Sequence, residues 1–345
     1  MIQQDQRIYN DNLPYEVKPF ITQKEKTRCY SMAINSDNNL VIVGSGYYIK
    51  VFEIQQTTLN ELQVLDEHKQ LVLCLSFFSK SSQTRSFISA ADTIIIWQEQ
   101  NRKWIVQNQL RIQEDKTQIQ SLVIHPQEDL IFCGSRDNIQ FWFQNLNAES
   151  DEIQQQKQQQ EWICKPYQYS NIFGLSINQK GDRLIACGTG QEILVMAGNN
   201  TTEWKVVEKI STNAYGLRLC FITNDVIAFQ ERGSRPHDQL QFYSLNSKEK
   251  LNQSNVKGGE QACNSLFPLS YIQSKQLIID RNGYCVNVVS IRQENQYQFQ
   301  TNVVQYFQFQ TEYIYGTVSN DGNLLILWND QEEEIQIRIF NASYY

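Results

Sequence analysis

The sequence predicts an all-β fold, a seven-bladed β-propeller of four-stranded antiparallel blades, and three observations support this prediction. Seven stretches of the 345-residue chain share one order of elements: an apolar strand, a polar turn, a second strand ending in small residues, and a third strand ending on an aromatic or bulky apolar residue. A fourth strand recurs after the third, and the two chain ends each hold part of one copy. A repeat of about 40–50 residues with several strands is typical of a propeller blade and not of a helical solenoid.

One apolar residue in each first strand marks the copies, and successive marks are 42 to 53 residues apart. The marks are Ile34, Phe77, Ile124, Ile177, Leu219, Phe267 and Val318. In the first copy we expect strands at Cys29–Ile34, Leu40–Gly44, Tyr48–Ile54 and Leu59–Leu65. These segments are rich in β-branched and aromatic residues and are bounded by Asn, Asp, Gly and Ser, which favour turns.

The fourth strand of a copy is clearest in three places along the chain. We expect it at Lys103–Leu110 (KWIVQNQL), at Glu161–Tyr167 (EWICKPY) and at Glu203–Ile210 (EWKVVEKI). With this strand each copy has four strands, which is the number in one propeller blade.

The chain ends predict how the ring closes. The seventh copy stops after three strands, five residues beyond Phe340, whereas a strand-like segment, Tyr15–Ile21, precedes the first copy without a partner of its own. We expect this N-terminal segment to be the closing strand of blade seven, because closure removes the unpaired strand edges of an open array. Residues 1–345 are then a single propeller domain.

Glutamine supplies much of the polarity of the chain, and about one residue in eight is Gln. The strongest bias is in residues 148–160 (AESDEIQQQKQQQ), between the third and fourth strands of the third copy. With so few apolar residues this segment cannot bury a face, so we expect a Gln-rich loop insertion.

Composition and charge argue against several classes of function. The net charge of −7 and the pI near 5.2 argue against a nucleic-acid binder, which needs Lys and Arg against phosphates. No apolar run approaches the ~20 residues of a membrane helix, and the N-terminal residues lack a signal-peptide core. The eight cysteines show no CxxC pair, so we expect free thiols, no metal site and no cofactor, in the cytoplasm or alternatively the nucleus.

Residues of the second and third copies resemble the WD-repeat family. The second copy has His68 before its first strand, Ser89 and Asp92 around the turn after its second strand, and Trp97 in its third strand. The resemblance covers essentially the whole chain and implies a buried, hydrogen-bonded structural chain of these four side chains. Because no copy ends in the Trp-Asp pair of that family, a subfamily is not assigned.

The third copy retains part of the same pattern. Asp137 follows its second strand and Trp142 lies in its third strand. The resemblance implies a partial version of the hydrogen-bonded set there.

Catalytic motifs are absent from the sequence. The three histidines, His68, His125 and His237, lie in three different copies, and no nucleophile elbow, phosphate loop or metal-ligand spacing occurs. We therefore expect no catalytic residues and no enzymatic activity. Arg218 is the one charged residue of the first strands, and it either binds an anion at the centre of the ring or pairs with an acidic neighbour.

The remaining hypothesis is a non-catalytic protein–protein interaction scaffold. In the WD-repeat family the loops between blades, and those between second and third strands, gather on one rim. The candidate partner-binding residues in such loops are Arg136, Arg232, Arg235, His237 and Arg281. Arginine binds carboxylates bidentately, which suggests an acidic peptide as partner. The alternatives are a propeller enzyme with a site in the central channel, or a phosphoinositide or nucleic-acid reader.

Overall fold

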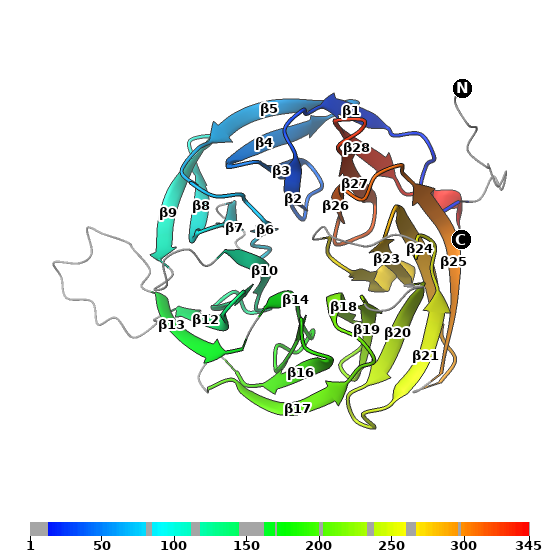
Figure 1. Ribbon diagram of the computed structural model, residues 1–345. Coiled ribbons are helices and arrows are strands. Elements are labelled where there is room, and N and C mark those ends of the chain that lie inside the picture. Colours follow the sequence, from blue (N-terminus) through cyan, green and yellow to red (C-terminus); the bar gives the residue numbers. More distant parts are fainter. Residues whose placement is uncertain are drawn as a thin grey trace.

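The computed structural model describes residues 13–80, 85–111, 118–144, 162–169, 171–199, 203–232, 238–259, 267–295 and 298–344. Within these residues the chain forms seven antiparallel sheets of four strands each, arranged as the blades of a closed ring (Figure 1). The predicted seven-bladed propeller is confirmed. The Gln-rich segment 148–160 lies outside the described residues.

Each blade has its first strand at the centre of the ring and its fourth strand at the outside (Figure 1). The first strands are β2 (Cys29–Ile34), β6 (Cys74–Phe77), β10 (Ile119–Ile124), β14 (Ile172–Ile177), β18 (Gly216–Phe221), β22 (Ser270–Ile272) and β26 (Ile314–Val318). The second strands are β3 (Leu40–Ser45), β7 (Ser86–Ala90), β11 (Leu130–Ser135), β15 (Arg183–Gly188), β19 (Val226–Glu231), β23 (Leu277–Asn282) and β27 (Leu324–Asn329).

The third and fourth strands complete the blades. The third strands are β4 (Tyr48–Gln55), β8 (Thr93–Gln100), β12 (Asn138–Gln144), β16 (Glu192–Ala197), β20 (Gln239–Ser244), β24 (Cys285–Gln293) and β28 (Glu334–Ile339). The fourth strands are β5 (Thr58–Leu65), β9 (Lys103–Arg111), β13 (Trp162–Gln168), β17 (Lys205–Ser211), β21 (Lys250–Asn255), β25 (Phe299–Gln308) and, for blade seven, β1 (Ile21–Lys24).

The N-terminus closes the ring, although its regular strand is shorter and later than predicted. β1 pairs with β28 from Ile21↔Ile337 onward, and Tyr15 makes an isolated bridge to Phe340. The predicted segment Tyr15–Ile21 therefore runs beside β28 but is mostly irregular. Pro19 explains this interruption, because proline has no N–H to donate to a ladder and restricts the residue before it.

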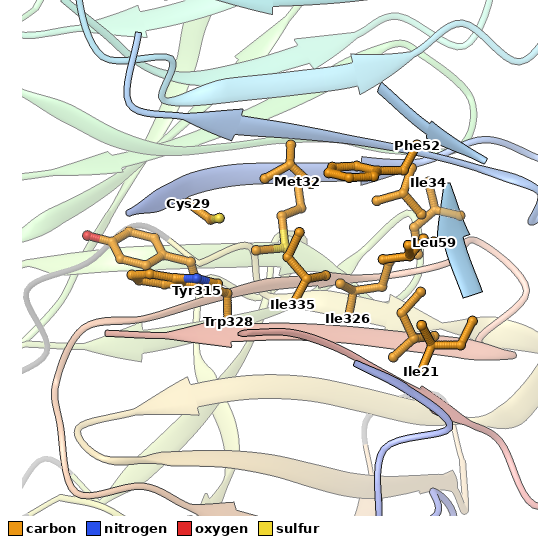
Figure 2. Packing of buried hydrophobic residues seen from close by; sticks show 13 residues of the cluster. Ile21, Cys29, Met32, Ile34, Phe52, Leu59, Tyr315, Ile326, Trp328 and Ile335 are labelled. Carbon is orange, nitrogen blue, oxygen red and sulfur yellow. The ribbon is translucent and has the colours of Figure 1, made fainter. Parts of the chain in front are cut away.

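The hydrophobic core is divided among the interfaces between neighbouring blades. Second strands such as β3 and β11 are buried along their whole length, since a neighbouring blade covers each face of the sheet. Figure 2 shows the interface that closes the ring, where Met32 and Phe52 of blade one face Ile335 of blade seven. The apolar strands of the repeat are thus explained by burial on both faces.

Side-chain amides join the outer strands of neighbouring blades. The Gln63 amide donates to the Trp104 carbonyl at 2.9 Å and accepts from the Trp104 N–H at 2.8 Å. Gln305 makes the same reciprocal pair with Tyr15, at 2.7 and 2.8 Å. One amide carries both a donor and an acceptor, so it can replace a missing backbone partner. Part of the glutamine content therefore has a structural role.

Candidate functional site

One rim of the propeller combines the loops that enter the first strands with the turns between second and third strands. The Gly46 N–H donates to the Arg28 carbonyl at 3.1 Å, and the Val72 N–H donates to the Gly46 carbonyl at 3.0 Å. In blade five the Arg232 N–H donates to the Tyr215 carbonyl at 2.6 Å. We call this surface the entry rim. It is the rim on which the sequence places its candidate binding residues.

The entry rim of blades seven and one carries a cluster of aromatic side chains around one arginine. The Arg28 guanidinium lies 4.1 Å from the Tyr313 ring centroid and 5.9 Å from that of Tyr30. Tyr47 and Tyr48, in the next turn, are 51% and 49% exposed. We call these five residues the tyrosine sector. Adjacent exposed tyrosines in a loop next to an arginine favour a binding surface, because Tyr and Arg often dominate the energy of protein interfaces.

Buried polar contacts hold the loop that enters blade one, which carries part of the tyrosine sector. The Trp328 indole N–H donates to the Glu25 carbonyl at 2.9 Å, and the Glu25 carboxylate accepts from the Thr27 N–H at 3.1 Å and pairs with Lys50. Gly46 has φ of 63°, a left-handed conformation that suits glycine and turns the chain sharply before Tyr47. The loop entering blade one is therefore fixed in position.

Blade seven holds the other side of the sector. Asp330 accepts a hydrogen bond from the Thr311 hydroxyl at 2.7 Å, and the same hydroxyl accepts from the Tyr313 N–H at 3.1 Å. The Asp330 carboxylate also lies 3.6 Å from the Arg28 guanidinium. Charge and ring stacking together thus orient Arg28 across the junction where the ring closes.

A β-bulge at the entry-rim end of four first strands adds further side chains near the centre of the ring. In blade one the register shifts between Cys29 and Ser31, so Tyr30 is the extra residue. Gln120, Phe173 and Leu217 occupy the corresponding places in blades three, four and five. Bulges redirect side chains and are common beside functional sites.

The predicted arginine rim is only partly present. Arg136 is exposed beside blade four, and the Arg232 guanidinium lies 5.8 Å from the Tyr215 ring centroid. Arg235 and His237 lie outside the described residues. The prediction for Arg281 is wrong, because this side chain is fully buried and donates to the Glu312 carbonyl. It belongs to strand β23 and not to the turn that follows.

Arg281 instead belongs to a buried charged cluster between blades five and six. Arg218 of β18 donates to the Phe267 carbonyl at 2.8 Å and to the Arg281 carbonyl at 2.9 Å. Asp280 is fully buried beside both arginines. Burial raises the pKa of Asp280 to about 6, and the attraction of Arg218 and Arg281 offsets only part of that rise. Of the two roles open for Arg218, the electrostatic attraction to Asp280 favours the acidic neighbour, although the hydrogen bonds of the guanidinium go to carbonyl groups.

In blade two the structure connects three of the four side chains of the expected hydrogen-bonded set. The Trp97 indole N–H donates to the Ser89 hydroxyl at 2.8 Å, and His68 Nε2 lies 2.7 Å from the same oxygen. His68 Nδ1 is 3.9 Å from Asp92, which is longer than a hydrogen bond. Burial lowers the pKa of His68 to about 4, against the attraction of Asp92, so the imidazole is neutral at pH 7.

Blade three is built differently at the same position. Trp142 pairs with Ile131, two places before Cys133, and Trp97 pairs with Phe87, two places before Ser89. Strand register therefore aligns Cys133 with Ser89. The Trp142 indole therefore donates to Gln140, at 3.1 Å, and not to a hydroxyl. Asp137 lies in the adjoining turn, where its N–H donates to Ser135 at 3.3 Å.

His125 and most of the described cysteines are buried in the fold. His125 is buried and its Nε2 lies 2.9 Å from the Gly181 carbonyl of blade four. Burial raises the pKa of Cys164 and Cys285 to about 11 and raises that of the other described thiols. These thiols are protonated at neutral pH and are poor nucleophiles.

No three His, Cys, Asp or Glu side chains in the described ranges come together as a metal site would require. None of the helical turns in the same ranges has the length and apolar character needed to span a bilayer.

Comparison with known proteins identifies the fold. No protein-family model matches the sequence, and no curated protein matches it. Among solved structures, one chain of the "Crystal Structure of Mitotic Checkpoint Complex" is similar with a TM-score of 0.65 and 13% identity, over 97% of this chain and 95% of that chain. In total 1613 chains of solved structures are similar, so the fold is common and does not by itself specify a function.

Proposed function

We propose that this chain is a divergent WD-repeat propeller that acts as a non-catalytic scaffold and binds a partner protein or peptide on its entry rim. The observation that carries the proposal is the tyrosine sector, with Tyr47 and Tyr48 half exposed in the turn whose Gly46 is hydrogen-bonded to the Arg28 backbone. Tyrosine and arginine are the residue types that most often dominate the energy of protein interfaces. The similar solved chain comes from a multi-protein complex, which agrees with such a role.

The proposal places the protein in a reducing compartment, the cytoplasm or the nucleus. The seven cysteines among the described residues are all free thiols, and six of them are buried. Secreted proteins more often link such residues in disulfides.

The test is purification of the tagged full-length protein from its native cell, comparing the wild type with a Tyr47→Ser, Tyr48→Ser variant. We expect the variant to lose a partner that the wild type retains in stoichiometric amount, because both side chains would lie in the interface. The matched control is Asp37→Ala with Ser36→Ala, two exposed residues of the β2–β3 turn on the opposite rim. If the tyrosine variant keeps every partner of the wild type, the tyrosine sector is not the binding site.

A further inference from the structure

The loops around Tyr47 and Tyr48 form one continuous surface. The turn at Gly46 is hydrogen-bonded on one side to Arg28, in the loop that enters blade one. On its other side it is hydrogen-bonded to Val72, at the end of the connection from blade one to blade two. Arg28 in turn contacts Tyr313 and Asp330 of blade seven. The two exposed tyrosines therefore lie between loops contributed by blade seven and by the connection to blade two.

This surface is acidic. Apart from the buried Glu25, which is paired with Lys50, residues 26–28, 46–48, 66–70, 311–313 and 330–333 contain six acidic and three basic side chains. The acidic side chains are Asp66, Glu67, Glu312, Asp330, Glu332 and Glu333, and the basic ones are Lys26, Arg28 and Lys69. His68 adds no charge at neutral pH, because burial lowers its pKa to about 4. A ligand approaching the tyrosines therefore meets a negative surface.

The carboxylates of this surface differ in whether they have a partner within the chain. Glu25 is paired with Lys50, and Asp330 lies beside Arg28. By contrast, Asp66, Glu67 and Glu333 make no hydrogen bond or ion pair through their side chains with any part of the chain that the structure describes. Glu67 lies in the connection that ends at Val72, and the Glu333 carbonyl accepts from the Glu25 N–H in the loop that enters blade one. Unpaired carboxylates in loops next to exposed aromatic rings suit a cation, which is attracted by the charge and by the ring faces.

The sector already holds one cation in this way. The Arg28 guanidinium stacks on Tyr313 and pairs with Asp330, so this ring and this carboxylate accommodate a guanidinium of the chain itself. Within the described residues, no cation of the chain stacks on Tyr47 or Tyr48 and none pairs with Glu67 or Glu333, so these groups are open to a cation of a partner. The same acidic surface disfavours a second copy of this chain, whose net charge is −7.

We propose that the partner segment bound by the tyrosine sector is a basic peptide, whose Lys or Arg side chains stack on Tyr47 and Tyr48 and pair with Glu67 and Glu333. This inference rests on the proposed function and adds the chemistry of the partner. It differs from the acidic peptide that the sequence suggested for the arginine-bearing loops, because Arg28, the arginine of this sector, is already paired.

The test uses the full-length protein and two fluorescent peptides that differ only in charge, one alternating Lys with Gly and one alternating Glu with Gly. We expect the Lys peptide to bind more tightly, as measured by anisotropy, and to weaken when salt is raised from about 50 to about 300 mM. Glu67→Lys with Glu333→Lys should weaken it by roughly tenfold or more. The matched control, Asp37→Lys with Glu203→Lys, makes the same charge change at exposed residues of the opposite rim and should weaken it by less than about twofold.

A further variant separates this inference from the proposed function. Tyr47→Ser with Tyr48→Ser changes no charge and should weaken the Lys peptide by roughly fivefold if the rings stack on its cations. Equal losses in the sector and control charge variants would overturn the inference, since the binding would then follow net charge alone. Tighter binding of the Glu peptide, abolished by the tyrosine variant, would also overturn it but would leave the entry rim as the binding surface.

Discussion

Blade two and blade six place different chemistry at one position of the repeat. In blade two the pairing of the third and fourth strands shifts just before Trp97, which pairs with Phe87, two places before Ser89. In blade six the same shift comes just before Val289, which pairs with Ile278, two places before Asp280. Strand register therefore aligns Ser89 with Asp280. Ser89 is fully buried in a neutral network with His68 and Trp97. Asp280 is equally buried but lies among charged groups.

The two blades show two ways of burying a polar group at this position. A hydroxyl can accept from one neighbour and donate to another, so blade two needs no charge. A carboxylate cannot be buried without compensation, and blade six supplies it through Arg281 and, across the blade interface, through Arg218. The neutral network lies within one blade, whereas the charged cluster joins two.

The largest loss of unfolding free energy should come from removing the positive charge that compensates the buried Asp280 in blade six. We expect Arg281→Leu to lower the free energy of unfolding by about 3–5 kcal/mol, because the change leaves the buried Asp280 carboxylate with less opposite charge. Urea unfolding followed by tryptophan fluorescence measures the loss. The control is Arg136→Leu at an exposed site, with a loss within about 0.5 kcal/mol. An Arg281→Leu loss as small as the control would show that Arg281 does not compensate Asp280.

A smaller loss should follow from breaking the network of blade two. Ser89→Ala removes the oxygen that both Trp97 and His68 contact, and we expect it to cost about 1–3 kcal/mol of unfolding free energy. Combining it with Trp97→Phe, which removes the indole donor, should cost less than the sum of the two single changes. Strict additivity in urea unfolding would contradict a shared network.

The smallest expected effect is on the pH dependence of the free energy of unfolding, in which His68 and Asp280 act in opposite directions. The pKa of His68 is lowered to about 4 in the folded protein, from about 6.5 in the unfolded chain. The contribution of His68 to the free energy of unfolding is therefore complete above pH ~6.5 and is lost as pH falls toward 4. The pKa of Asp280 is raised to about 6, from about 3.9, so its contribution is complete below pH ~3.9 and is lost as pH rises through 6. The two groups therefore oppose one another between about pH 4 and pH 6.

Single substitutions should separate these opposing slopes. Relative to the wild type, Asp280→Asn should make unfolding free energy rise more steeply with pH in that window, and His68→Gln should make it rise less steeply. Each difference is limited to about 1.4 kcal/mol per pH unit, the value for one proton. Urea unfolding at pH 4, 5 and 6 measures both slopes. Identical slopes in the two variants would contradict the assigned titrations.

Most of the strand order could be predicted from the sequence, because each strand depends on local chemistry. β2 begins at Cys29 and β9 at Lys103, as predicted, since apolar runs and turn residues mark their ends. The sequence predicted which blade the N-terminal segment completes but not which of its residues form the regular strand, because Pro19 interrupts the predicted segment. His68, Ser89 and Trp97 could be proposed together because they belong to one copy of the repeat, with Ser89 21 positions after His68 and Trp97 8 positions after Ser89.

The candidate site could not be read from the sequence in the same way. Arg28 and Tyr313 are brought together only when the ring closes, and no local pattern connects them. Tyr30 projects from a bulge, which depends on strand register. Arg281 seemed to be a loop residue because it precedes Asn282 and Gly283, but β23 continues through Asn282.

The sequence by itself determined the repeat, the number of blades and the closure by the N-terminal segment, because these follow from the order of apolar strands and turns along the chain. Only the tertiary structure decided which arginines are exposed and where tyrosines gather. Asp280 and Arg218 are buried together, and Tyr47, Arg28 and Tyr313 form one surface, because blades far apart in the sequence pack side by side in the ring. Burial and contact between blades depend on that packing, which no single copy of the repeat contains.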